Sequence, residues 1–540
     1  MKRQFSMAFT GDSGFTESAK RIKYDRQLRL WDDHGQHALE SAHVCLINAT
    51  ATGTEILKSL VLPGIGAFTI LDSKLITGED AGNNFFLDKE SIGKSRAKTA
   101  TEHLLELNPD VRGEFVDESV ECILQAEPNF FCKFSVVIVT DVEECLLLNL
   151  APKLWDQNVP LLICRAYGLI GYLRLQVRDR TIIETRPENE FHDLRLDAPF
   201  PALKEYAETI DLDKLTDQEH AHVPFVIILL KFLDIWKNRN NNEIPKNMKE
   251  KNLFKAEIQK SMRKKDEEEN FEEACRAVNR SVTKTTIPGE IQEILNDPMC
   301  EDLSSESKSF WILVKALKEF VENEGNGCLP VRGVIPDMTS DTQSYIKLQN
   351  IYKTKAEEDA HNMYVRVQEI LCKLGKASNF ISEHDVKIFC KNAHCLRVLR
   401  GRSLKEEYDA TKSEVQNMVG NLEHEDSDII FYVLLRAADR FNSEYCRYPG
   451  RNNDDVESDI IKLKNCISSL MQEWGCSPVM KDDYIHEMCR FGAAELHSVA
   501  AFVGGCAAQE VIKLITGQYV PFNNTVIYYA LNQTTSVFYL

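Results

Sequence analysis

Short apolar runs alternate with helical patterns along the first third of the chain. The runs contain four to six residues each, as buried strands do, and lie at 43–47, 67–71, 111–116, 136–140 and 161–164. Between them, apolar residues recur every three or four positions, which predicts helices over 54–62 and 95–107. Because strands that alternate with helices favour a parallel sheet with right-handed crossovers, we expect an α/β domain of the Rossmann type.

The pattern changes twice further along the chain. After about residue 179 the alternation stops, and residues 200–480 show the spacing of helices. From about residue 482 a long apolar helix and two short strands could complete the first sheet. We therefore predict four parts: a polar tail at 1–22, the N-terminal part of an α/β domain at 23–179, a mainly helical insertion at 180–481, and the C-terminal part of the α/β domain at 482–540.

Composition narrows the classes of function. Lys and Arg number 64 and Asp and Glu 83, a net charge of −19 that argues against nucleic-acid binding and against adhesion to anionic membranes. The 16 cysteines include no C-x-x-C pair, so we expect no zinc site and reduced thiols, as in cytoplasmic or nuclear proteins. The longest apolar stretch, 223–230, is too short to cross a bilayer, so we expect no membrane insertion.

The loop after the first strand is the main chemical clue. In nucleotide-binding Rossmann units this loop reads G-x-G-x-x-G, whose glycines let backbone N–H groups approach phosphates. Here only the last glycine is present, because the loop reads Asn48, Ala49, Thr50, Ala51, Thr52 and Gly53. We expect a loop that keeps the fold without binding a nucleotide; a weakened nucleotide site is the alternative. Asp72 stands where a ribose-binding acid would be, and we interpret it as a polar cap at the end of a strand.

Several segments together resemble the ubiquitin-like-modifier activating enzymes. The matching segments are YDRQLRLW at 24–31, GQHALESAHV at 35–44, TEILKSLVLPGIGAFTILD at 54–72, IGKSRA at 92–97 and VAAFVGGCAAQEVIKLITGQ at 499–518. The resemblance covers about residues 23–540 and implies a Rossmann-like, ThiF/MoeB-like pseudo-adenylation domain split by a large, mainly helical insertion. Within the family, GEDAGNNFF at 78–86 and PLLICRAYGLIGY at 160–172 resemble the regulatory subunits of neddylation-activating enzymes.

Departures from the family's active half imply that this chain is not an enzyme on its own. The stretch at 83–87 lacks the nucleotide-facing arginine, and Asp141 lacks the asparagine that follows the metal-binding aspartate of active members. We therefore predict no metal site and no catalytic residue. No cysteine lies in a recognisable nucleophile motif, and Cys328 is at most a weak candidate.

Arg26 is the residue for which the resemblance implies a role in catalysis. In the family, an arginine in the R-Q-x-x-L segment reaches ATP phosphates in the partner's active site. Gln27 and Arg29 are possible supporting residues. The alternative reading is that Arg26 pairs with Asp25 or another acid on its own helix.

The resemblance also implies the partners. We expect a heterodimer with the catalytic subunit of the neddylation-activating enzyme, which would hold ATP and magnesium, and contacts with the neddylation modifier and its conjugating enzyme. Two alternatives remain: a self-sufficient ATP-dependent adenylyltransferase of the same superfamily, and a cytosolic scaffold that retains the fold. A nicotinamide-dependent dehydrogenase fits least, because the loop lacks the pyrophosphate-binding glycines.

Overall fold

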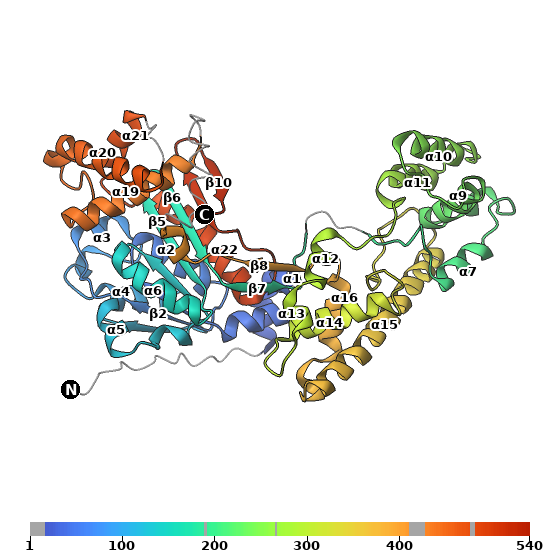
Figure 1. Cartoon of the computed structure of the whole chain (residues 1–540), viewed down its shortest axis with the longest axis horizontal. Helices are drawn as coiled ribbons and strands as arrows, with labels where there is room; N and C mark the ends of the chain where they lie inside the picture. Colours follow the sequence, from blue (N-terminus) through green and yellow to red (C-terminus); the bar gives the residue numbers. More distant parts are fainter. Residues whose placement is uncertain (1–16, 188–191, 265–266, 410–426, 476–480) are drawn as a thin grey trace. The chain divides into compact units, whose positions relative to one another are not determined.

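The chain divides into two compact units. The computed structural model describes residues 17–187, 192–264, 267–409, 427–475 and 481–540. One unit comprises Met1–Arg180 and Val398–Leu540, and the other comprises Thr181–Arg397 (Figure 1). The first unit is the α/β domain and the second is helical, as the sequence predicts.

An eight-stranded sheet forms the centre of the α/β unit. Its strands are β1 (His43–Ile47), β2 (Ala67–Leu71), β3 (Arg112–Val116), β4 (Val136–Thr140), β5 (Leu161–Tyr167), β6 (Ile170–Gln176), β9 (Thr525–Tyr529) and β10 (Thr534–Phe538). The strand order is β10-β9-β6-β5-β4-β1-β2-β3. The five strands from β3 to β5 run parallel, whereas β6, β9 and β10 are antiparallel to their neighbours.

The antiparallel part corrects the expectation of a purely parallel sheet. β5 and β6 are joined by a tight turn at Gly168, whose φ is 57°, and a turn this short can only reverse the chain. The last two strands extend the sheet beyond β6 and confirm that the C-terminal segment completes it.

Helices cover both faces of the sheet. They are α1 (Glu17–Ser41), α2 (Ala51–Val61), α3 (Gly78–Asn83), α4 (Arg96–Leu105), α5 (Val120–Ala126), α6 (Glu144–Asp156), α17 (Leu404–Tyr408), α19 (Ile429–Tyr445), α20 (Val456–Glu473), α21 (Asp482–Phe491) and α22 (His497–Thr516). Val44 and Leu46 of β1 belong to one core with α2, α4 and α22. Cys45 and Ile47 alternate with them and belong to a second core with α6, α19 and α20. Three layers result, with the sheet in the middle.

Two of these helices bear on the sequence expectations. α1 begins at Glu17, inside the predicted tail, and residues 1–16 of that tail lie outside the described residues. Among the described residues, α22 is the one helix whose length and apolar composition would allow it to span a bilayer. In the structure, 56% of its apolar stretch is buried.

The second unit is built from helices: α7 (Pro201–Thr209), α8 (Asp217–His220), α9 (Phe225–Arg239), α10 (Met248–Lys260), α11 (Glu269–Ser281), α12 (Gly289–Leu295), α13 (Pro298–Glu301), α14 (Ser309–Glu322), α15 (Thr342–Lys373) and α16 (Glu383–Asn392). The apolar faces of α7, α9, α10 and α11 meet in a separate core. The chain leaves the α/β unit along the short strand β7 (Asp179–Ile182) and returns to it along β8 (Arg397–Arg400), and these two strands pair in a two-stranded sheet.

The insertion ends earlier in the structure than at the predicted residue 481. The helical unit ends at Arg397, and α19 and α20 belong to the α/β unit. The reason is packing: Phe431, Leu434 and Phe441 of α19 are buried in the core on one face of the sheet. Helical periodicity shows that a segment has an apolar face, but it does not show which surface that face covers.

Candidate functional site

The degenerate loop lies at the position that Rossmann domains use for nucleotides. It connects the carboxyl end of β1 to the start of α2, at the point where the strand order reverses from β2 on one side to β4 on the other. Asn48 replaces the first glycine and keeps a positive φ of 66°, which asparagine tolerates better than most residues. Its side-chain amide donates to the carbonyl oxygens of Thr140 and Asp141, at 2.9 and 2.7 Å, and so ties the loop to the end of β4.

The one glycine that remains is needed for packing. A Cβ atom at Gly53 would lie 2.8 Å from the Asn48 carbonyl oxygen and 3.1 Å from the Leu46 side chain. Helix α2 could not then approach β1 as closely. Thr50 occupies the second glycine position, where its hydroxyl caps α2 by accepting from Gly53 N at 3.3 Å. The loop therefore keeps the glycine that the fold requires and lacks those that phosphates require.

The chain itself uses the backbone donors that a phosphate would need. Ala49 N donates to Asp72 Oδ2 at 2.9 Å. At the start of α2, Ala51 N donates to Glu495 Oε2 at 3.0 Å and Thr52 N to Glu495 Oε1 at 3.4 Å. The Thr52 hydroxyl also donates to Glu495 Oε1, at 2.6 Å. Because carboxylates and phosphates bind the same N–H groups at a helix N-terminus, Glu495 lies where a phosphate would lie.

The contacts of Asp72 confirm that this residue is a polar cap at the end of β2. Its buried carboxylate accepts from the backbone of Ala49 and of Lys74 and forms an ion pair with Arg96 Nε at 2.6 Å. Arg96 also pairs with Asp80 through Nη1 at 3.0 Å. Burial acts to lower the pKa of the Arg96 guanidinium, but the two carboxylates outweigh it and raise that pKa. The carboxylate that would hold a ribose thus holds the loop and a buried cation.

Asp141, at the place of the metal-binding aspartate of active members, forms an ion pair within this chain. Asp141 Oδ2 pairs with Lys74 Nζ at 2.9 Å. No group of three or more His, Cys, Asp or Glu side chains suited to a metal occurs among the residues that the structure describes. Partial burial raises the pKa of the Cys328 thiol, which disfavours the nucleophilic thiolate at that position.

Arg26 is exposed on α1, and it does not form the ion pair that the alternative reading proposed. Asp25 pairs instead with Arg29, through Nη2 at 3.0 Å. Within the described residues, the Arg26 side chain forms no hydrogen bond and no ion pair. Gln27 has a structural contact, since its amide donates to the Pro63 carbonyl oxygen at 3.0 Å.

Arg26 lies within an exposed apolar stripe. Ile22, Arg26 and Leu30 follow one another at four-residue steps, which places them on one face of α1. The flanking side chains are large and apolar, with exposed fractions of 77% for Ile22 and 51% for Leu30. A kink at Asp32, with φ of 56°, ends this straight part of the helix. The stripe offers one cation between two apolar side chains.

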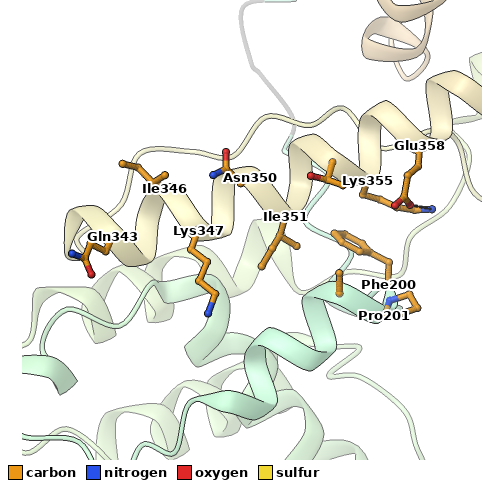
Figure 2. A pocket seen from close by; sticks show the side chains of 11 residues that line it. Phe200, Pro201, Gln343, Ile346, Lys347, Asn350, Ile351, Lys355 and Glu358 are labelled. Carbon is orange, nitrogen blue, oxygen red and sulfur yellow. Dashed lines mark ion pairs between the residues drawn. The ribbon is translucent and has the colours of Figure 1, made fainter.

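Each unit also contains a cavity. One of about 610 Å³ adjoins the loop in the α/β unit and is lined by Ala51, Arg96 and Glu495 among other residues. The other, of about 730 Å³, lies in the helical unit between the start of α7 and the first half of α15 (Figure 2). Phe200 and Ile351 form part of its apolar wall.

Comparison with known proteins agrees with this geometry. Residues 24–141 match the ThiF family, which gives the class of the fold and of the loop. A protein of Xenopus laevis named "NEDD8-activating enzyme E1 regulatory subunit" is 53% identical over 526 residues, which cover 96% of this chain and 99% of that protein. Proteins of the same name from Drosophila melanogaster and Caenorhabditis elegans are 46% and 37% identical, and the matches cover 95% and 96% of this chain and 96% and 98% of theirs. The chain belongs to the family of NEDD8-activating enzyme E1 regulatory subunits.

Sequence reasoning missed Glu495. It lies 444 residues after Ala51, next to the start of α22, and only the completed fold brings the two together. Acidic residues are common near the start of a helix, so Glu495 carries no local signal of its own. Nothing local links that acid to the loop.

Proposed function

We propose that this chain is the non-catalytic regulatory subunit of a heterodimeric activating enzyme for a NEDD8-type modifier. The catalytic partner would bind ATP and magnesium, adenylate the modifier and carry the thioester cysteine. One observation carries this proposal: the backbone N–H groups of the loop at 48–53, which would bind a phosphate, donate instead to side chains of this chain. The acceptors are Asp72, Glu495 and Thr50. The names of the relatives support the same role.

The contribution of this chain to catalysis would be Arg26, acting in the partner's site. Adenylation develops negative charge on phosphate oxygens, and a guanidinium can donate two parallel hydrogen bonds to them. The exposure of Arg26 and the apolar side chains of Ile22 and Leu30 on the same helix face favour insertion into a partner's surface. A cation supplied from outside makes the reaction depend on assembly of the heterodimer.

The helical unit would frame the modifier and the conjugating enzyme, and the complex would act in the cytoplasm, with the nucleus as a second location. These assignments rest on the resemblance and on the relatives' names.

ATP–pyrophosphate exchange tests the role as a regulatory subunit. We expect no exchange from the chain alone and modifier-dependent exchange after the catalytic partner is added. Robust exchange by the chain alone would contradict the proposal and support a self-sufficient adenylyltransferase. Failure to co-purify with such a partner would support a scaffold instead.

A matched pair of substitutions tests the role of Arg26. Arg26→Ala should lower the exchange rate of the assembled complex at least about tenfold, since trans arginines contribute 10³-fold or more in related phosphoryl chemistry. Arg29→Ala removes the same charge one turn away, from a side chain already paired with Asp25, and should change the rate less than about twofold. Equal effects of the two substitutions, with intact assembly, would exclude a specific role for Arg26.

A further inference from the structure

The start of α2 is an anion site with a carboxylate already bound. Glu495 accepts from two successive backbone N–H groups, of Ala51 and Thr52, and from the Thr52 hydroxyl. The dipole of the eleven-residue helix favours negative charge at the same place. Partial burial raises the pKa of the Glu495 carboxyl, while the hydrogen bonds from Thr52 and Thr50 act in the opposite direction.

The wall of the adjoining cavity gives a second, independent observation. The Arg96 side chain, only 6% exposed, lines this cavity of about 610 Å³. Its Nε and Nη1 atoms hold Asp72 and Asp80, but Nη2 is buried and has no hydrogen-bond partner within the described residues. A buried guanidinium N–H without an acceptor is costly, so this wall of the cavity lacks one hydrogen-bond acceptor.

Charged side chains of both signs line the cavity: five are basic and four are acidic, and Glu495 is one of the four. The basic side chains are paired with carboxylates, and three of these partners, Asp72, Asp439 and Asp459, lie outside the lining. The basic side chains include Arg451, which pairs with Glu79 at the surface, and Lys74, which pairs with Asp141.

We propose that Glu495 is an internal ligand of this anion site: it occupies the place of a phosphate group, and its removal opens the site to a small anion of the phosphate class. In the native chain, the carboxylate keeps the loop in a ligand-bound arrangement without any nucleotide. This inference concerns the chain alone and does not depend on the role of Arg26.

Pyrophosphate binding to the isolated full-length chain tests the proposal. The partner is left out because its own site would bind the probe. With calorimetric titration at constant ionic strength, Glu495→Ala should bind about one pyrophosphate per chain, at least about tenfold more tightly than the native chain. Glu487→Ala makes the same change of charge on α21, outside the cavity, and should leave binding unchanged.

A second substitution separates occupancy from charge. Glu495→Gln keeps the shape and an oxygen acceptor, so the site should stay closed to pyrophosphate. Glu495→Gln that binds as tightly as Glu495→Ala would overturn the proposal, because charge alone would then explain the gain. A native chain that binds pyrophosphate as tightly as Glu495→Ala would overturn it too, as would a folded Glu495→Ala chain that binds none.

Hydrogen exchange gives a second measurement, which also reports on the loop in the native chain. In the native chain, a peptide spanning residues 49–54 should exchange slowly, and added pyrophosphate should not change its rate. In Glu495→Ala the same peptide should exchange faster, and pyrophosphate should slow it again. Exchange in the native chain as fast as in an unfolded peptide would show that Glu495 does not hold the loop. None of these outcomes bears on the regulatory role of the chain, which ATP–pyrophosphate exchange tests separately.

Discussion

Two adjacent glycines in α22 should respond in opposite ways to the same substitution. A Cβ atom at Gly504 would lie 2.8 Å from the Glu55 Cβ and 3.2 Å from the Ile56 backbone nitrogen, both in α2. A Cβ atom at Gly505 would meet nothing within 4 Å. Close packing against α2 therefore explains a glycine at 504 but not at 505.

The magnitudes follow from two opposing terms. Replacing a glycine by alanine inside a helix gains about 1 kcal/mol from backbone conformational preference. Gly505→Ala should keep most of this gain. At Gly504 a carbon–carbon distance of 2.8 Å is roughly 1 Å too short, and overpacking of that kind costs about 1–3 kcal/mol. The net effect of Gly504→Ala should be a loss of about 1 kcal/mol.

Urea unfolding of the full-length chain measures both effects. With a slope of about 3 kcal/mol per molar urea for a unit of this size, the midpoints should move by roughly 0.3 M in opposite directions. The two substitutions are each other's control, since they change the same atoms in the same helix. A higher midpoint for Gly504→Ala would contradict the inferred contact between α2 and α22.

One further prediction concerns a buried ion pair, and another concerns pH. Glu407→Gln should lower the unfolding free energy by about 3–5 kcal/mol, because Arg174 and Glu407 form an ion pair with no exposed side-chain area; Glu487→Gln, in an exposed pair, should change it by less than about 0.5 kcal/mol. Burial acts to raise the pKa of Asp459, but hydrogen bonds from Arg447, Gly450 and Lys462 hold it at about 2. The lowered pKa stabilises the fold above pH 4 by about 2 kcal/mol, and this contribution is lost as the pH falls from 4 to 2. Asp459→Asn should therefore lower the urea midpoint at pH 7, and the difference from the native chain should shrink as the pH falls from 4 to 2. A difference that stays constant with pH would contradict the lowered pKa of Asp459.

Much of the fold could be predicted because strands and helices leave local patterns. The apolar runs that became β1, β2 and β4 were placed correctly to the residue, since a buried strand must be apolar on both faces. The missing glycines of the loop likewise predicted a loop without free phosphate-binding donors, and the backbone N–H groups of Ala49, Ala51 and Thr52 do donate to carboxylates of this chain; the loss of nucleotide binding itself stays a prediction. The end of the insertion was misplaced because α19 has the same periodicity as the helices of the other unit.

The chemistry of the site was predictable only in part. Asp72 stood in a recognisable position after a strand, and its role as a cap is confirmed. Glu495 had no such marker, because its contact with Ala51 depends on the folding of the whole α/β unit. The role of Arg26 stays a prediction, since a residue that acts in a partner's site shows only exposure and an absence of ion pairs in its own chain.

The two halves of the α/β unit also set an order of events during synthesis. Six of the eight strands of the sheet are complete in sequence by residue 180, yet α22, which covers one face of them, begins only at His497. At about 5–20 residues per second, a ribosome needs roughly 15 to 60 s to make the intervening chain. Throughout that time the early strands lack their C-terminal cover. We therefore expect the nascent chain to expose apolar strands for far longer than a continuous domain would, until its last helix emerges.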